Sequence, residues 1–154
     1  MNRLTWATKL QYAKTIAADL KVIHGVQLIH CDLHGGNIVL YTQSSRSFIC
    51  DLGLSKSTSS SPSASTIQGV LPYIAPEVLD SHKFTPKSDI YSFGIIMHQI
   101  ANGEPPFRDR QFDRDLVCDI LNGLRPKMPD SAPDEYRKLA ERCYDANPDM
   151  CPDA

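Results

Sequence analysis

The 154-residue sequence lacks the features that mark secreted, membrane-spanning or nucleic-acid-binding proteins. No apolar run approaches the roughly 20 residues that cross a bilayer, and the first residues contain no apolar signal core. Sixteen basic residues stand against eighteen acidic ones, so charge favours neither nucleic acid nor an anionic membrane. The five cysteines form no C-x-x-C pair, which argues against a zinc ribbon or a disulfide framework. We expect one domain, free thiols and a cytoplasmic location.

Apolar spacing predicts helices in much of the chain. The first helical stripe consists of Trp6, Leu10, Ala13, Ala17 and Leu20. Thr5 is placed to cap this helix and Gly25 to end it. A later run that ends before Gly103 is apolar on nearly all faces, which predicts a buried central helix. Two more helical patterns lie around residues 112–122 and 135–146.

Short β-prone runs lie in the first third of the sequence. Residues 38–40 and 48–50 are predicted to pair as a small hairpin with a seven-residue connection, 41–47. Residues 55–66 hold seven Ser and two Thr, a composition typical of a mobile surface loop. The predicted fold is therefore mainly α, with one small β-hairpin.

Asp32, Asn37 and Asp51 lie in short loops beside these runs, where binding groups are commonly displayed. Two glycines between Asp32 and Asn37 let that loop bend back, and Gly53 permits a sharp turn after Asp51. Two carboxylates and an amide that converge would form an oxygen-rich site suited to Mg²⁺. On spacing alone, three solvated loop side chains explain the same residues equally well.

A different site follows from the alternation of His30, Asp32 and His34. On a β-strand this spacing would place all three side chains on one face, as in the zinc site of a hydrolase. That interpretation leaves the acidic turn at 51–53 and the segment 75–77 without a role.

Five segments resemble motifs of the protein kinase family. Residues 30–37, His-Cys-Asp-Leu-His-Gly-Gly-Asn, resemble the catalytic loop H-R-D-L-x-x-x-N. Residues 51–53 (Asp-Leu-Gly) resemble D-F-G, and residues 75–77 reproduce A-P-E. Residues 89–94 are similar to D-x-[WY]-S-x-G, and the stretch 123–148 resembles the tyrosine-kinase-like branch. The motifs follow the family order over essentially the whole chain, 1–154.

The resemblance implies ATP-dependent phosphoryl transfer to a protein Ser or Thr hydroxyl, with Tyr the less favoured acceptor. Asp32 would accept or orient the proton of the substrate hydroxyl, and Asn37 and Asp51 would hold Mg²⁺ against the nucleotide phosphates. His34 stands where serine/threonine kinases carry a Lys that contacts the transferred phosphate. An imidazole is a weaker substitute for that ammonium group.

Structural or regulatory roles follow by the same resemblance for His30, Cys31, Gly53, Glu77 and Asp89. His30 is the core histidine, and Asp89 is expected to be buried and to hold the catalytic-loop backbone. The alternative for Asp89 is an exposed helix N-cap. Cys31 replaces an Arg that pairs with a phosphorylated loop. At the position where the family has the Arg that pairs with Glu77, this sequence has a cysteine. We therefore expect that Glu77 pairs with another cation, contacts water or has a raised pKa.

Residues 51–77 correspond to the activation segment, with Ser59 and Thr66 as candidate phosphorylation sites. Cys31 replaces the usual cationic partner of a phosphate group. For residues 57–65 we therefore favour a solvated connection, whose serines only contact water, over a set of phosphorylation sites. The C-terminal helices are expected within 87–146.

The family's G-x-G-x-x-G loop and V-A-I-K strand have no counterpart in the sequence. The resemblance therefore implies a large lobe with the small lobe absent, from a parent fold of α+β class. The expected partners are a protein substrate and a scaffold or small-lobe-supplying protein. The non-enzymatic alternative is a truncated, inactive pseudokinase that acts as an interaction module.

Overall fold

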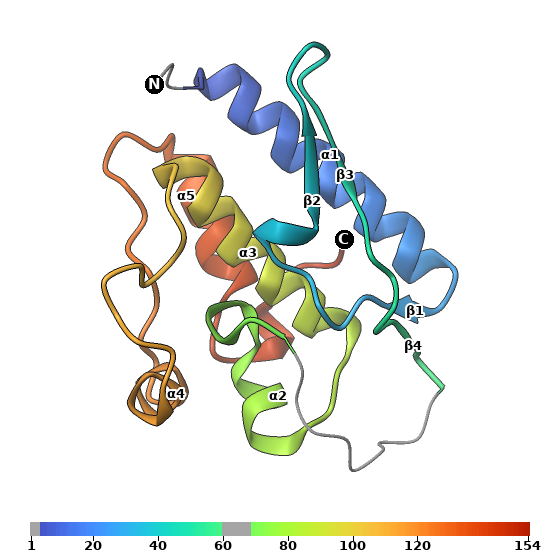
Figure 1. The fold of residues 1–154 in the computed structure, drawn as a ribbon, viewed down its shortest axis with the longest axis vertical. Coiled ribbons are helices and arrows are strands. Elements are labelled where there is room, and N and C mark those ends of the chain that lie inside the picture. Colours follow the sequence, from blue (N-terminus) through green and yellow to red (C-terminus); the bar gives the residue numbers. More distant parts are fainter. Residues whose placement is uncertain (1–3, 60–68) are drawn as a thin grey trace.

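The computed structural model describes residues 4–59 and 69–154. These residues are mainly helical, as predicted, with two two-stranded sheets (Figure 1). The α-helices are α1 (Trp6–Gly25), α2 (Pro76–Ser81), α3 (Pro86–Asn102), α4 (Arg114–Leu121) and α5 (Asp134–Cys143). The strands are β1 (Leu28–Ile29), β2 (Ile38–Tyr41), β3 (Arg46–Ile49) and β4 (Lys56–Ser57). No helix in the described part of the chain is long and apolar enough to cross a membrane.

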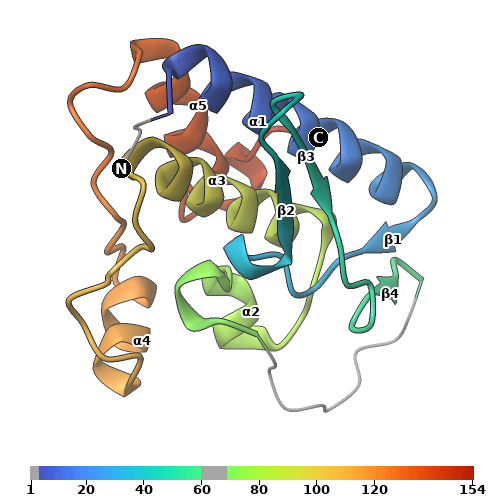
Figure 2. The ribbon, with the colours of Figure 1, turned by 45° about the horizontal axis from the view of Figure 1, so that its top comes forward.

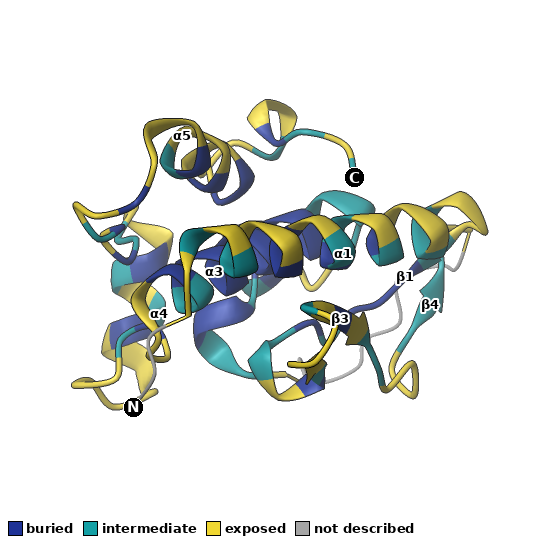
Figure 3. Cartoon of the chain, turned by 90° about the horizontal axis from the view of Figure 1, so that it is seen from above, coloured by how far each residue is buried: buried dark blue, intermediate teal, exposed yellow. Residues whose placement is uncertain are grey.

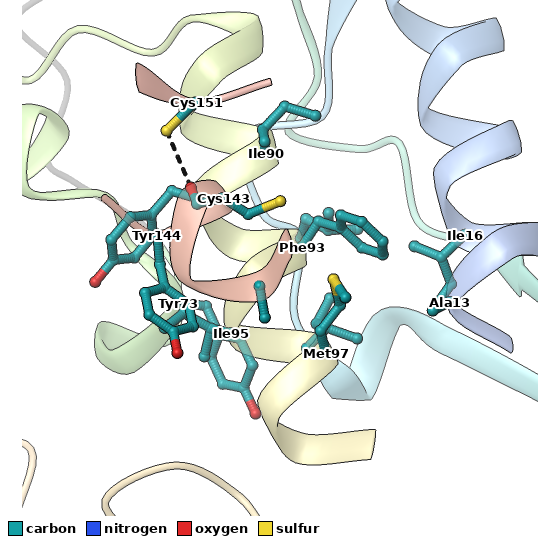
Figure 4. Packing of buried hydrophobic residues seen from close by; sticks show 14 of the residues in the cluster. Ala13, Ile16, Tyr73, Ile90, Phe93, Ile95, Met97, Cys143, Tyr144 and Cys151 are labelled. Carbon is teal, nitrogen blue, oxygen red and sulfur yellow. Dashed lines mark hydrogen bonds between the residues drawn. The ribbon is translucent and has the colours of Figure 1, made fainter. Parts of the chain in front are cut away.

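Helix α3 forms the centre of the molecule, as its all-round apolar pattern predicts. It begins with Pro86 at the first helical position and a capping box between Thr85 and Ser88. Gly103 ends it in the left-handed conformation, at a φ of 80°. Helices α1 and α5 both pack against α3 (Figure 2). Its buried side chains supply much of the hydrophobic core, seen from close by in Figure 4.

The contact between α3 and α5 depends on Gly94. A Cβ atom at this position would lie 2.7 Å from Cys143 Cβ and 3.1 Å from the Ala140 carbonyl oxygen. The two helices thus approach more closely than any larger residue would allow. Cys151 follows α5 and donates its thiol to the Cys143 carbonyl at 3.0 Å (Figure 4). All five cysteines are free.

Helix α1 has the predicted bounds, with Thr5 accepting a hydrogen bond from the Thr8 backbone. The predicted apolar stripe was wrong in part, because Leu10 is 47% exposed whereas Tyr12 and Ile16 are buried. The reason is that α1 contacts both α3 and β3, and so buries more than one narrow face. Figure 3 shows buried and exposed bands alternating along this helix.

Strands β2 and β3 form the predicted antiparallel hairpin, but its connection is shorter than predicted. Tyr41 pairs with Arg46, so the turn comprises residues 42–45 rather than 41–47. The hairpin is fixed on α1 by polar contacts. Ser47 donates its hydroxyl to the Tyr12 carbonyl at 3.0 Å, and the Asp19 carboxylate accepts from the Ile49 backbone at 3.1 Å.

The prediction of a continuous mobile loop over 55–66 was wrong at its start. Lys56 and Ser57 form β4, which pairs antiparallel with β1. Thr58 extends this pairing through its backbone and its hydroxyl, both of which donate to Gln27. The cause is a neighbouring edge strand, which the local Ser-rich composition cannot reveal. The rest of the predicted loop, from residue 60 onward, lies outside the described residues.

Candidate active site

Asp89, in the first turn of α3, is 1% exposed and holds the backbone of the loop 30–37. Its carboxylate accepts hydrogen bonds from the His30 N–H at 2.8 Å and the Cys31 N–H at 3.1 Å. The His24 ring nitrogen Nε2 lies 2.9 Å from the same carboxylate. The structure thus places Asp89 beneath the loop, while the role of N-cap falls to Thr85. A buried carboxylate with three partners fixes the loop to the central helix α3.

Cys31 has an unusual backbone conformation for a residue with a side chain, with a φ of 67°. Asp51, on the other side of the site, has a φ of 62°. Left-handed conformations at residues other than glycine cost free energy and gather at functional sites. The Cys31 thiol is buried, and this desolvation raises its pKa to about 11, so it stays protonated at neutral pH. Cys31 therefore serves as packing and not as a nucleophile.

The imidazole of His30 is fully buried and bridges two loops. Its Nδ1 accepts from the Asp32 N–H at 3.3 Å, and its Nε2 lies 3.2 Å from the Cys50 carbonyl oxygen. With Nδ1 as the acceptor, Nε2 carries the proton and donates to Cys50. His30 thereby ties the residue before Asp51 to the loop that carries Asp32.

Asp32 and Asn37 meet directly. The Asn37 amide nitrogen Nδ2 donates to the Asp32 backbone carbonyl at 2.8 Å and reaches the Asp32 carboxylate oxygen Oδ2 at 3.3 Å. The side chain of Asp32 is 18% exposed. The bonds use the NH₂ group of Asn37, which leaves its carbonyl oxygen as the atom that can bind a cation.

His34 faces the same carboxylate. Its Nε2 lies 3.6 Å from Asp32 Oδ2, while its Nδ1 accepts from the Gly36 N–H at 3.0 Å. In the neutral ring this arrangement puts the proton on Nε2, directed to the Asp32 side. The ring also lies 6.1 Å from that of Tyr73. His34 can therefore donate a hydrogen bond at the site without carrying a charge.

Asp51 follows β3, and none of its side-chain contacts among the described residues reaches Asp32 or Asn37. The Cys50 N–H donates to the Asn37 carbonyl at 3.0 Å. The backbone of Asn37 is thus bonded to the residue that precedes Asp51. The Asp51 carboxylate oxygen Oδ1 accepts from the Gly53 N–H at 3.1 Å, and Asp51 itself is exposed. Its other oxygen is available to a cation. Asn37 and Asp51 thus offer hard oxygen donors, which fit Mg²⁺.

The zinc-hydrolase interpretation was wrong. Both ring nitrogens of His30 are engaged by the protein, so neither can ligate a metal. Residues 4–59 and 69–154 contain no group of three His, Cys, Asp or Glu side chains that could hold a metal ion. The alternation in the sequence is not strand periodicity, because the residues around 30–34 form a bent loop.

Glu77, at the start of α2, makes no ion pair within 4.0 Å among the described residues. Burial raises the pKa of its carboxyl group, and the positive charge of Arg125 opposes that shift. Of the predicted outcomes, the raised pKa is the one that the structure supports, and Arg125 acts only as a positive charge that opposes it. Burial, and after it the negative charge of Glu77, raises the pKa of the Cys151 thiol to about 11.

Other positions of the activation segment are placed in part. The hydroxyl of Ser59 lies exposed, 2.9 Å from that of Ser57, whereas Thr66 lies outside the described residues. Gly69, at the other end, approaches the site, since a Cβ there would lie 3.3 Å from Asp32 Oδ1. Sequence reasoning missed His24 and Gly69, because only the tertiary fold brings them to the site.

A model of the protein kinase domain family matches residues 3–152 of the chain. Similar proteins include a "probable serine/threonine-protein kinase" of Dictyostelium discoideum, 29% identical over 93% of this chain. Mitogen-activated protein kinase kinase kinase 5 of Homo sapiens is 30% identical over 90%, and cyclic GMP-binding protein C of Dictyostelium discoideum is 32% identical over 97%.

The chain spans 11%, 10% and 6% of the lengths of these three relatives. The likeness therefore concerns one domain of much longer proteins. It covers the loop that carries Asp32, the hairpin that leads to Asp51, and helix α3 with Asp89. On the family match, the chain belongs to the protein kinase domain family.

Proposed function

We propose that the chain is the large lobe of a serine/threonine protein kinase and that it transfers phosphate from ATP to a protein hydroxyl. The observation that carries this proposal is the direct contact of Asn37 with Asp32, on a loop anchored by Asp89. A loop held so firmly keeps a carboxylate and an amide in fixed geometry, and phosphoryl transfer depends chiefly on positioning.

Asp32 accepts the proton of the substrate hydroxyl. The Asn37 amide bonded to its carboxylate orients one oxygen, and the His34 ring stands on the same side. The half-buried setting limits solvation of the carboxylate but leaves it reachable by a substrate side chain. The close approach of Gly69 to this carboxylate supports the role, because a protein substrate would dock beside the segment that carries Gly69.

Asn37 and Asp51 would hold the magnesium ion of the nucleotide through their side-chain oxygens. Bound there, the ion would supply charge neutralisation during phosphoryl transfer. The chain's own contribution is to orient these ligands, through the Cys50–Asn37 backbone bond and the Asp51–Gly53 turn. His34, with its proton on Nε2, donates a hydrogen bond to the transferred phosphate in place of the family's Lys.

A small lobe with the Gly-rich loop and its Lys completes the nucleotide cleft in this proposal. The β2–β3 hairpin supports the expectation of a small lobe, because Val39, Tyr41 and Phe48 expose 43–58% of their surfaces. Val39 and Phe48 are paired across the strands, so they form one apolar surface that a second lobe could cover.

The test is titration of the chain with ATP in the presence and absence of Mg²⁺, followed by calorimetry. We expect ATP binding that requires Mg²⁺ and weakens at least about tenfold in Asp51→Asn. Asp130→Asn is the matched control, because the Asp130 side chain is 89% exposed on a distant link. In the natural protein that contains these residues, Asp32→Asn should abolish phosphate transfer but keep ATP binding.

An inactive interaction module makes the opposite prediction. It would bind ATP equally well, or equally poorly, with and without Mg²⁺, and Asp51→Asn would behave like the control. This alternative draws support from Cys31, whose thiol cannot pair with a phosphorylated loop.

A further inference from the structure

The loop 30–37 contains two adjacent glycines, Gly35 and Gly36, immediately before Asn37. Glycine has more backbone freedom than any other residue, so a segment of this kind needs support to keep one conformation. Residues Gly35–Asn37 form a single turn of 3-10 helix, which is too short to be stable by itself. Asp89 anchors only the other end of the loop. The glycine end therefore requires a second support.

The side chain of Gln99, near the C-terminal end of α3, covers this glycine turn. A Cβ atom at Gly35 would overlap Gln99 Oε1 and would lie 2.9 Å from both Cδ and Nε2 of the same amide group. The amide thus occupies the space that a side chain at position 35 would need, and only glycine permits so close an approach. Figures 1 and 2 show the turn before β2 beside α3.

The oxygen of this amide also bonds to Tyr73. The Tyr73 hydroxyl donates to Gln99 Oε1 at 2.8 Å, and burial raises the pKa of this hydroxyl to about 12, so it remains a donor at neutral pH. The same helix holds the backbone of Tyr73, because the Ser92 hydroxyl donates to the Tyr73 carbonyl at 2.7 Å. Tyr73 is therefore fixed to α3 at its carbonyl and at its hydroxyl.

Tyr73 belongs to the segment 69–77, and the centre of its ring lies 6.1 Å from that of His34. One amide group thus contacts the loop 30–37 through Gly35 and the segment 69–77 through Tyr73. Gln99 lies ten residues after Asp89 on α3, about 15 Å along the helix axis. The central helix therefore supports the loop at both ends, with a carboxylate at one end and an amide at the other.

We propose that Gln99 is a positioning residue of the candidate active site: its amide acts through Gly35 and Tyr73 to keep His34 and Asn37 in place. The catalytic consequence of this role rests on the proposed function, whereas the positioning itself does not. Phosphoryl transfer depends chiefly on how precisely the reacting groups are held, so a looser loop lowers the rate. Gln99 itself touches neither the transferred phosphate nor the substrate proton.

The first test uses nitrogen NMR of the imidazole groups and amide hydrogen exchange on the full chain. In the parent, His34 Nδ1 accepts from the Gly36 N–H at 3.0 Å, which places the ring proton on Nε2. In Gln99→Ala, we expect a mixture of His34 tautomers and exchange of the Gly36 amide at least about fivefold faster. Tyr73→Phe, which removes only the hydroxyl, should change both in the same direction. Gln11→Ala, an exposed glutamine on α1, is the matched control and should change neither.

Gly35→Ala tests the same contact from the loop side. Its new Cβ should displace the flexible Gln99 amide and so reproduce the change that Gln99→Ala causes at His34. In the double variant the second substitution should add little, because the two act on one contact. Gln99→Glu keeps an acceptor oxygen for Tyr73 and should restore the parent exchange rate of the Gly36 amide. Fully additive effects in the double variant, or a Gln99→Ala chain that matches the parent in both measurements, overturn the proposal.

The second test measures phosphate transfer by the natural protein that contains these residues. Gln99→Ala should lower kcat at least about tenfold and should change KM for ATP by less than it changes kcat. If the parent transfers no phosphate but the NMR changes occur as expected, the positioning role stands and the proposed function fails. If the parent transfers phosphate and Gln99→Ala alters neither kcat nor the His34 resonances, the proposed function stands and the positioning role is refuted.

Discussion

Removing the Asp89 carboxylate should loosen the loop 30–37 more than any other single change to it. Asp89→Ala leaves the N–H groups of His30 and Cys31 buried without acceptors and deprives His24 of its partner. Each buried N–H group left without an acceptor costs about 1–3 kcal/mol in the free energy of unfolding. Asp89→Asn keeps one acceptor oxygen. If that oxygen takes the Oδ2 position, which serves His30 and His24, only the Cys31 bond is lost, at about 1–3 kcal/mol.

Urea unfolding followed by circular dichroism measures the global cost, and amide hydrogen exchange measures the local one. The His30 and Cys31 amides should exchange faster in Asp89→Ala than in the parent, by more than the change in global stability explains. Asp130→Asn, an exposed change, should stay within about 0.5 kcal/mol of the parent. If both Asp89 variants match that control and neither amide exchanges faster, the anchoring role of Asp89 is refuted.

Three further predictions concern packing, charge and the site. Gly94→Ala should lower the free energy of unfolding by about 1–3 kcal/mol in urea unfolding despite alanine's better helix propensity, because the new Cβ would clash with Cys143; equal or higher stability would contradict this. Because burial raises the pKa of Glu77, its charge opposes folding above its titration range; Glu77→Gln should therefore raise the melting temperature near pH 7, by a margin that vanishes at acidic pH. A constant margin across pH would refute that cause. His34→Lys should raise the rate of phosphate transfer by the natural protein at least about tenfold. An unchanged rate in an assay with radiolabelled ATP would show that the side chain at position 34 does not contact the phosphate.

Much of the helical framework follows from local chemistry, so the sequence predicts it well. The cap at Thr5, the stop at Gly103 and the apolar circumference of α3 depend on residues close together in the chain. The errors arise where distant segments meet. Tyr12, which the predicted stripe left out, is buried where β3 docks on α1, and Lys56 joins a strand because β1 offers an edge. Neither event leaves a signature in local periodicity.

The candidate site also contains residues that the sequence predicts and residues that only the fold reveals. Motif resemblance predicted Asp32, Asn37 and Asp51 as site residues, and the structure brings Asp32 and Asn37 into contact. It could not find His24 beneath Asp89, because the two are 65 residues apart and meet only through the packing of α1 on α3. Arg125 was also missed as the cation near Glu77, since charge partners at long range follow from the fold and not from order along the chain.

The account depends most on Asn37 and Asp51 offering their free oxygens to one cation beside Asp32. Manganese, which prefers the same oxygen ligands as magnesium and broadens nearby NMR signals, tests this directly when added to the isotope-labelled chain with ATP. The account predicts that the resonances of Asn37, Asp51 and Gly53 broaden first, and that Asp51→Asn removes the effect. Broadening that begins at another acidic cluster, or that leaves those three resonances sharp at saturation, would contradict it.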